Sequence, residues 1–350
     1  MRTESDTPPA EAPRPEAPRV TARESVATLL RTGRITVLGR IPEASNDTYL
    51  VVVAEDVDES VPGPAPRAVR AVYKPRAGEA PLHDFPYGTL ADREVAAHVL
   101  SAVLDLDVVP PTVLRTDAPR GEGSLQAYVE QVPIDDEPDP DTAPEAPRTP
   151  ATDTSVGEGE GASAAEDDFA AAEGRDLVSL FPASALGPGG PFVPGPDGVP
   201  PWAPVVSGTT EDGTPVYVAH RTGERMRRLA FFDLLANNAD RKGSHVLYGQ
   251  YSFEPGDSPD VWGIDNGLSF HPEPKVRSVL WGFAGTPFDE VETAALRRVV
   301  EDPSVLDALR EVLDDPLGLA SLQARAAGML AAGEFPHPPE DRYPLPWPPL

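Results

Sequence analysis

Two polar segments, each placed directly after an apolar element, decide the interpretation of this chain. The first is NNADRKGSH (residues 237–245), which follows a helical pattern over residues 224–238. The second is IDNGLSF (residues 264–270), which follows an apolar strand pattern. A plain helix-to-strand turn and a plain Asn-Gly turn account for either segment taken alone. Their succession, one short strand pair apart, favours the catalytic and metal-binding loops of a phosphotransferase.

Within these two segments, four side chains have the chemistry that phosphoryl transfer needs. In kinases a catalytic Asp is followed by a metal ligand at the fifth position. Asp240 and His245 stand at these two positions, and Lys242 is expected to reach the γ-phosphate. Asp265 is expected to bind the divalent metal. If His245 is a metal ligand, the site should prefer Mn²⁺ over Mg²⁺, because imidazole suits softer ions. The alternative is that His245 only packs under the loop.

The N-terminal half of the chain offers a cation for the phosphates. A strand pattern over residues 68–73 ends at Lys74, and a helical pattern over residues 89–104 carries Glu94 as a partner for that lysine. A surface Lys and an exposed helix Glu are the plain alternatives. We expect backbone amides and hydroxyls of the loop with Ser45, Asn46 and Thr48 to cover the phosphates, since this loop lacks a Gly-rich pattern.

The order of the expected elements predicts an α+β fold in two lobes. Residues 21–133 read as strands around one helix, and residues 201–332 as a hairpin, a strong helix, two short strands and further helices. Residues 1–20 and an acidic, Pro- and Gly-rich insertion at 134–200 are expected to be disordered, and a Pro-rich tail occupies 333–350. For the helix over 89–104, Thr89 with Asp92 predicts a capping box.

Composition narrows the class of partner. The chain of 350 residues has 57 acidic and 29 basic side chains, a net charge of −28 and no cysteine. A chain with this net negative charge repels nucleic acid and anionic membrane surfaces, so we expect neither as a partner. It lacks disulfides and thiolate metal sites, and no apolar run suits a signal peptide or a membrane span. We therefore expect a cytoplasmic protein whose acidic insertion is available for a protein partner.

The motifs resemble those of a known family. YKPR followed by GEAP (residues 73–76 and 78–81) resembles the FKPK…EEP segment of type II phosphatidylinositol 4-kinases, and IDNGLSF is similar to their IDNGLAF. Together with ADRKGSH, the chain resembles actinobacterial proteins of the phosphatidylinositol 3- and 4-kinase superfamily. The resemblance covers about residues 25–130 and 200–330. It implies ATP and Mg²⁺ or Mn²⁺, with Lys74 on the phosphates, Asp240 as the catalytic carboxylate and Asp265 as a metal ligand.

These observations favour an ATP-dependent kinase that phosphorylates a hydroxyl group of a small molecule, a lipid headgroup or a protein. A nucleotide-binding pseudokinase with a regulatory role is one alternative, although a scaffold needs none of Lys74, Asp240 and Asp265. Transfer of a nucleotidyl group on the same fold is the other. The sequence alone does not identify the molecule that accepts the phosphate.

Overall fold

The computed structural model describes residues 22–42, 44, 46–56, 66–85, 88–134, 177–187, 190–194, 198, 200–210, 212–252 and 257–350. It is a mixed α and β structure with antiparallel sheets. The helices are α1 (Ala22–Thr32), α2 (Leu90–Val103), α4 (Glu224–Ala236), α5 (Glu290–Glu301), α6 (Pro303–Arg310) and α7 (Pro316–Ala332). The strands are β1 (Arg34–Arg40), β2 (Tyr49–Ala54), β3 (Ala68–Pro75), β4 (Thr112–Arg115), β5 (Gly123–Ala127), β6 (Glu130–Gln131), β7 (Val178–Pro182), β8 (Trp202–Thr209), β9 (Pro215–Arg221), β10 (Val246–Gln250) and β11 (Asp260–Gly263).

The largest sheet has the order β1-β2-β3-β5-β4, and its two faces have different surroundings. Because side chains alternate along a strand, Val51 and Tyr73 point to one face. There they pack in a core with Leu30 of α1. The other face carries Lys74 of β3 and Gln126 of β5, and both line a cavity. The period of two therefore separates a face packed in the core from a face that lines a cavity.

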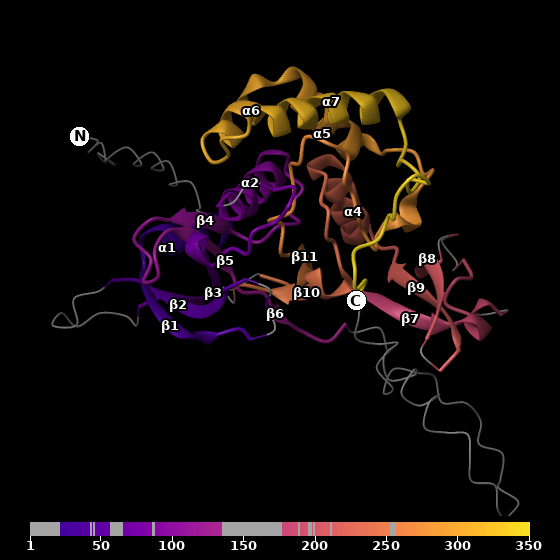
Figure 1. Ribbon diagram of the computed structural model, residues 1–350, viewed down its shortest axis with the longest axis horizontal. Helices are drawn as coiled ribbons and strands as arrows, with labels where there is room; N and C mark the ends of the chain where they lie inside the picture. Colours follow the sequence, from indigo (N-terminus) through magenta and orange to yellow (C-terminus); the bar gives the residue numbers. More distant parts are fainter. Residues whose placement is uncertain are drawn as a thin grey trace, which may run out of the picture.

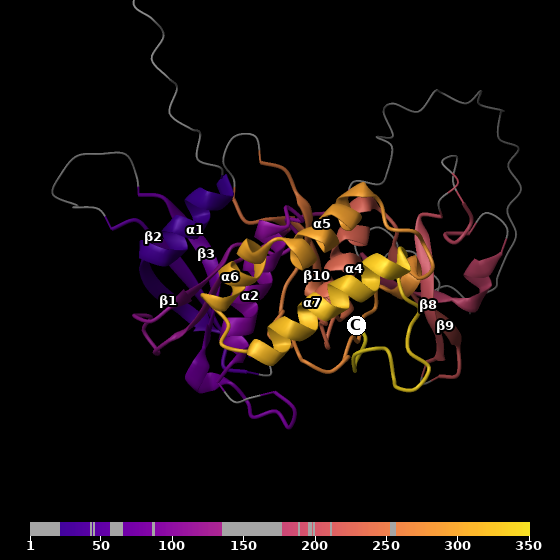
Figure 2. The same ribbon diagram turned by 90° about the horizontal axis from the view of Figure 1, so that it is seen from above.

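The helices of the second half form the main core. Figures 1 and 2 show α5, α6 and α7 as one layer, with α7 lying across α4. Side chains of α2 join the same core, so this helix connects the large sheet with the helical half. Residues 128 and 129 lead from β5 to β6, which pairs with β10, and β10 pairs with β11. The chain thus crosses from the large sheet to the short strands beside the two polar segments.

Strand β7 corrects the expected bounds of the insertion. Residues 178–182, which fall inside the predicted disordered segment 134–200, form the first strand of a sheet with the order β7-β9-β8. Phe181 packs there edge to face against Trp202, at 4.8 Å between ring centroids. That aromatic contact buries apolar area of the strand against β8. Residues 1–20 and 135–176 lie outside the described part of the chain.

The C-terminal segment 333–350 folds back onto the helical half. Phe335 and Leu345 are buried in the main core. Pro344 accepts hydrogen bonds from Trp281 Nε1 and from the backbone of Ser278. The carbonyl of Pro349 accepts from the backbone N–H of Gly243 at 2.8 Å. This segment, described from sequence only as a Pro-rich tail, therefore supports the loop that contains Gly243. No helix in the described ranges is both long and apolar enough to cross a membrane.

The cap of α2 differs from the prediction. Thr89 makes no side-chain cap hydrogen bond, and Asp92 pairs with Arg76 at 2.7 Å instead. The buried carboxylate of Glu79 accepts hydrogen bonds from the backbone of Leu90 at 3.2 Å and of Ala91 at 3.0 Å. The capping-box prediction was wrong because a carboxylate from the start of the segment that leads into α2 satisfies free N–H groups and faces the positive end of the helix dipole.

We predict that Glu79→Ala destabilises the protein by about 0.5–2 kcal/mol, the usual cost of losing an N-terminal cap. Glu79→Gln should reduce the free energy of unfolding by a smaller amount. Its amide keeps one acceptor oxygen for the helix N–H groups, and only the negative charge beside the helix N-terminus is lost. Urea unfolding of the three proteins measures both differences. An Ala variant as stable as the wild type contradicts the capping role of Glu79.

Candidate functional site

Lys74 lies at the centre of the candidate site. Its Nζ donates a hydrogen bond to Asp265 Oδ1 at 2.7 Å and another to Glu94 Oε1. The Lys74 side chain is 22% exposed and that of Glu94 is 3% exposed, whereas that of Asp265 is 46% exposed. Three elements far apart in sequence, β3, α2 and the segment after β11, therefore meet at one ammonium group. The side chain of Asp265 remains open to a ligand.

Glu94 also fixes the segment that contains Asp265. Its Oε2 accepts the backbone N–H of Asn266 at 3.0 Å, while Oε1 binds Lys74. Asp265 has a φ of 56°, a left-handed conformation that few non-glycine residues adopt. Such a conformation persists where its surroundings hold it in place, and it occurs often at functional sites. Here the two bonds of Glu94 hold the backbone and the lysine partner of Asp265 together.

The loop with Asp240 is anchored by a fully buried ion pair. The guanidinium of Arg241 binds both carboxylate oxygens of Asp233 in α4, at 2.9 Å for the shortest contacts. It also donates to the carbonyl of Ile264 at 2.7 Å and to Asn266 Oδ1 at 2.7 Å. Asn238 donates to Asp233 at 3.1 Å. Arg241 thus ties α4, its own loop and the segment after β11 into one unit.

Asp240, Lys242 and His245 lie next to this anchor, and Asp240 lines the same small cavity as Asp265. Lys242 Nζ lies 3.0 Å from Asp240 Oδ2. His245 Nδ1 lies 2.9 Å from the carbonyl oxygen of Asp240, and its Nε2 lies 3.4 Å from Asp265 Oδ2. Because a carbonyl only accepts, Nδ1 carries the proton, and a neutral ring presents a lone pair at Nε2. That lone pair faces a carboxylate, an arrangement that a cation between the two stabilises.

The charges at the site shift several pKa values. Burial would lower the pKa of Lys74, but Asp265 and Glu94 outweigh it and raise the pKa above its ordinary value. Lys74 in turn holds the pKa of Asp265 far below its usual range. Burial raises the pKa of Asp240, although Lys242 beside it pulls in the opposite direction. Burial also lowers the pKa of His245 below 6.5, against the attraction of Asp265, so its ring is neutral at pH 7.

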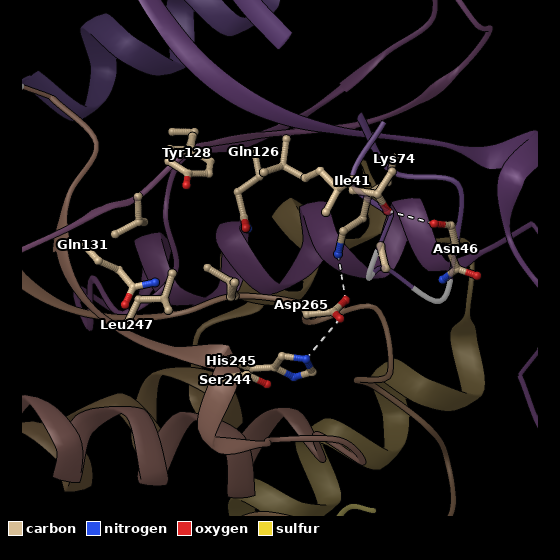
Figure 3. A pocket seen from close by; sticks show the side chains of 16 residues that line it. Ile41, Asn46, Lys74, Gln126, Tyr128, Gln131, Ser244, His245, Leu247 and Asp265 are labelled. Atoms are coloured by element: carbon tan, nitrogen blue, oxygen red, sulfur yellow. Dashed lines mark hydrogen bonds and ion pairs between the residues drawn. The ribbon is translucent and has the colours of Figure 1, made fainter. Parts of the chain in front are cut away.

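A cavity of about 300 Å³ lies between the large sheet on one side and strand β10 with the segment after β11 on the other. Lys74, His245 and Asp265 form one end of it (Figure 3). Gln126, Tyr128 and Gln131 line another part, and the apolar lining includes Ile41, Val72, Leu247 and Ile264. The cavity therefore joins a charged end to a largely apolar slot.

The expected phosphate-covering loop contributes in part. Asn46 and Thr48 line the cavity, and Thr48 Oγ1 donates to the carbonyl of Asn46 at 3.2 Å. Asn46 Oδ1 accepts from the backbone of Ala80 at 2.8 Å, which fixes the loop to the segment after β3. Ser45 lies outside the described residues. A second, smaller cavity of about 130 Å³ borders Asp240, Asp265 and Leu268 on the other side of Lys74.

The donor set fits a metal ion bound together with phosphates. In the described part of the chain, no three His, Asp or Glu side chains form a cluster that could hold a metal ion by themselves. Mg²⁺ in phosphotransferases is held by one or two carboxylates plus phosphate oxygens and waters, so a protein cage is not required. Asp265 Oδ2 and His245 Nε2, which lie 3.4 Å apart, are two atoms that could both contact such an ion.

Sequence reasoning missed the residues that support this site. Asp233 is the one charged residue in the apolar second half of helix α4, residues 229–236, and such a residue needs a buried partner. The partner, Arg241, stands inside the segment chosen for its chemistry. Gln126 in the buried strand β5 gave a similar signal. In each case a polar residue within an apolar element pointed to a hydrogen-bond network.

Comparison with known proteins places the chain in a family. The chain is 36% identical over 332 residues to Protein Rv2133c of Mycobacterium tuberculosis, and the match covers 94% of this chain and 97% of the relative. The chain therefore belongs to the same family as that protein. No family model matches the sequence.

We predict that Asp233→Asn destabilises the protein by about 3–5 kcal/mol, because it leaves the guanidinium of Arg241 buried without its counter-charge. The exposed pair Arg310–Asp307 provides the control: Arg310→Gln should change stability by less than about 0.5 kcal/mol. Urea unfolding measures both. A loss below about 1 kcal/mol for Asp233→Asn contradicts the anchoring role of the pair.

Proposed function

We propose that this protein is an ATP-dependent phosphotransferase with a two-lobed, protein-kinase-like fold related to the phosphatidylinositol 3- and 4-kinases. The observation that carries the proposal is the ammonium of Lys74, held between Glu94 and Asp265 at one end of a cavity. In this proposal β1–β5 with α2 form the smaller lobe, the helical half forms the larger one, and ATP binds in the cavity between them.

The charged end of the cavity suits a triphosphate. Lys74 contributes a compact positive charge that two carboxylates orient, a form suited to contacts with α and β phosphates. Asn46 and Thr48 line the same end and offer amide and hydroxyl groups to phosphate oxygens. Asp265 and His245 would hold the divalent ion, which neutralises charge on the phosphates. The apolar slot between Val72, Leu247 and Ile264 suits the flat face of a base.

In this proposal Asp240 accepts the proton of the acceptor hydroxyl. Burial raises its pKa, which makes its carboxylate a stronger base than a free Asp. Lys242, 3.0 Å from it, holds the carboxylate in place and offers a second cation near the phosphate to be transferred. Asp240 borders the smaller cavity beside Leu82, Leu90 and Leu268, so an acceptor that reaches Asp240 from that side meets apolar side chains.

We predict that ATP with Mg²⁺ or Mn²⁺ stabilises the protein by about 2.7 kcal/mol at a hundredfold excess over its Kd. Lys74→Met should weaken ATP binding, whereas Lys275→Met should not, because Lys275 pairs with Asp84 outside the larger cavity.

Asp240→Asn should retain ATP binding and lower ATP turnover by about 10²–10⁴-fold. Thermal shift and release of ADP measure these effects. Absence of any thermal shift with ATP and metal contradicts the proposal, and release of pyrophosphate instead of ADP indicates nucleotidyl transfer.

We also predict that turnover is higher with Mn²⁺ than with Mg²⁺, and that His245→Asn shifts the preference toward Mg²⁺. A neutral imidazole is required for binding a metal, so metal affinity should fall as the pH decreases through the His245 pKa, which burial places below 6.5. Metal titrations of ATP turnover at several pH values test both statements in the two proteins. An identical metal preference in wild type and variant removes His245 from the metal site.

A further inference from the structure

The cavity contains a second hydrogen-bond network, away from the charged end. Gln126 of β5 lies opposite Thr112 of β4 in the sheet register. Gln126 Nε2 donates to Thr112 Oγ1 at 2.9 Å, and Thr112 Oγ1 donates to the carbonyl of Pro110 at 2.9 Å. Both side chains are buried, with 7% exposure for Gln126 and 1% for Thr112. Nothing in the catalytic scheme above uses this network.

The network determines which way the amide of Gln126 faces. A hydroxyl has one proton, and the proton of Thr112 points to the Pro110 carbonyl, which can only accept. Thr112 therefore offers a lone pair to Gln126, so the NH₂ group must face Thr112. The remaining group, Oε1, faces away from Thr112. Gln126 lines the cavity, and Figure 3 shows the end of its side chain extending from β5 into that space.

We propose that Gln126 Oε1 selects the base of the bound nucleotide by accepting a hydrogen bond from an exocyclic amino group. The proposal rests on the nucleotide binding proposed above. Adenine carries such a donor at its 6-position, whereas hypoxanthine and guanine carry a carbonyl oxygen there. With those bases two acceptors would face one another, and a buried acceptor without a donor is costly. Thr112 acts as a positioning residue that holds the amide in the selective orientation.

The test is direct binding of ATP and ITP, which differ at the 6-position of the purine. We expect wild type to bind ATP about ten- to a hundredfold more tightly, the effect of one buried hydrogen bond gained or left unmade. Gln126→Leu should weaken ATP binding and bring the ratio of the two Kd values to about one. Isothermal titration calorimetry in the presence of Mg²⁺ or Mn²⁺ gives both constants without any need for turnover.

The matched pair Thr112→Val and Thr112→Ser tests the orientation itself. Val has the shape of Thr but no hydroxyl, so the amide is free to turn over and offer its NH₂ group to the carbonyl of ITP. ITP affinity should rise and the ratio should fall. Ser keeps the hydroxyl and should keep the wild-type ratio. This pair also decides the question if Gln126→Leu fails to fold.

The outcomes separate the two proposals. Wild type that binds ATP and ITP equally, or a Gln126→Leu or Thr112→Val variant that keeps the wild-type ratio, overturns the role of Gln126 and leaves nucleotide binding in place. Wild type that binds neither nucleotide overturns the proposed function, and the base selection with it.

Discussion

The buried ion pair between Arg241 and Asp233 is the interaction on which the site depends. Removing two charges from water is costly, and the cost is offset only when hydrogen bonds satisfy the remaining donors and acceptors. Here they do so. Arg241 binds Asp233, Asn266 and the carbonyl of Ile264, and Asn238 completes the shell of Asp233. Two apolar residues would hold α4 against the loop equally well. Only a planar group with five donors can fix three separate backbone segments in one orientation, so the pair contributes geometry more than stability.

That geometry connects the buried anchor to the charged surface of the cavity. Arg241 positions Asn266, whose backbone N–H binds Glu94, and Glu94 in turn binds Lys74. The path leads from α4 through the segment after β11 to α2 and β3. Each step is a hydrogen bond or ion pair to a charged group, the stronger class of hydrogen bond in proteins. Relative placement of the large sheet and the helical half is therefore coupled to the position of the Lys74 ammonium.

Much of this arrangement could be predicted from sequence where the signal is local. The strand before Lys74 and the helix with Glu94 follow from periodicity, and the structure contains both. The loop with Asp240 follows from a polar segment after an apolar helix. Predictions failed where the determining contact is distant in sequence. Thr89 has the residue type of a cap, yet Glu79, ten residues earlier in the same connecting segment, accepts the hydrogen bonds instead. Strand β7 exists because Phe181 meets Trp202, a contact that no window around residue 181 contains.

The pKa shifts at the site affect the stability of the fold in opposite directions. The pKa of Asp265 is lowered, so its contribution to stability is present above about pH 4 and is lost as the pH falls. The pKa of Lys74 is raised, so its contribution is present below about pH 10 and is lost as the pH rises further. The pKa of Asp240 is raised, and this has the opposite sign: ionisation of Asp240 at neutral pH reduces stability. Burial raises the pKa of the structural carboxylate Asp233 as well, so the sign of the shift alone does not distinguish the two groups. What distinguishes Asp240 is access: its side chain is 24% exposed and lines a cavity, whereas Asp233 is enclosed by Arg241 and Asn238. The combination of a raised pKa and an open cavity is what the base proposed above requires.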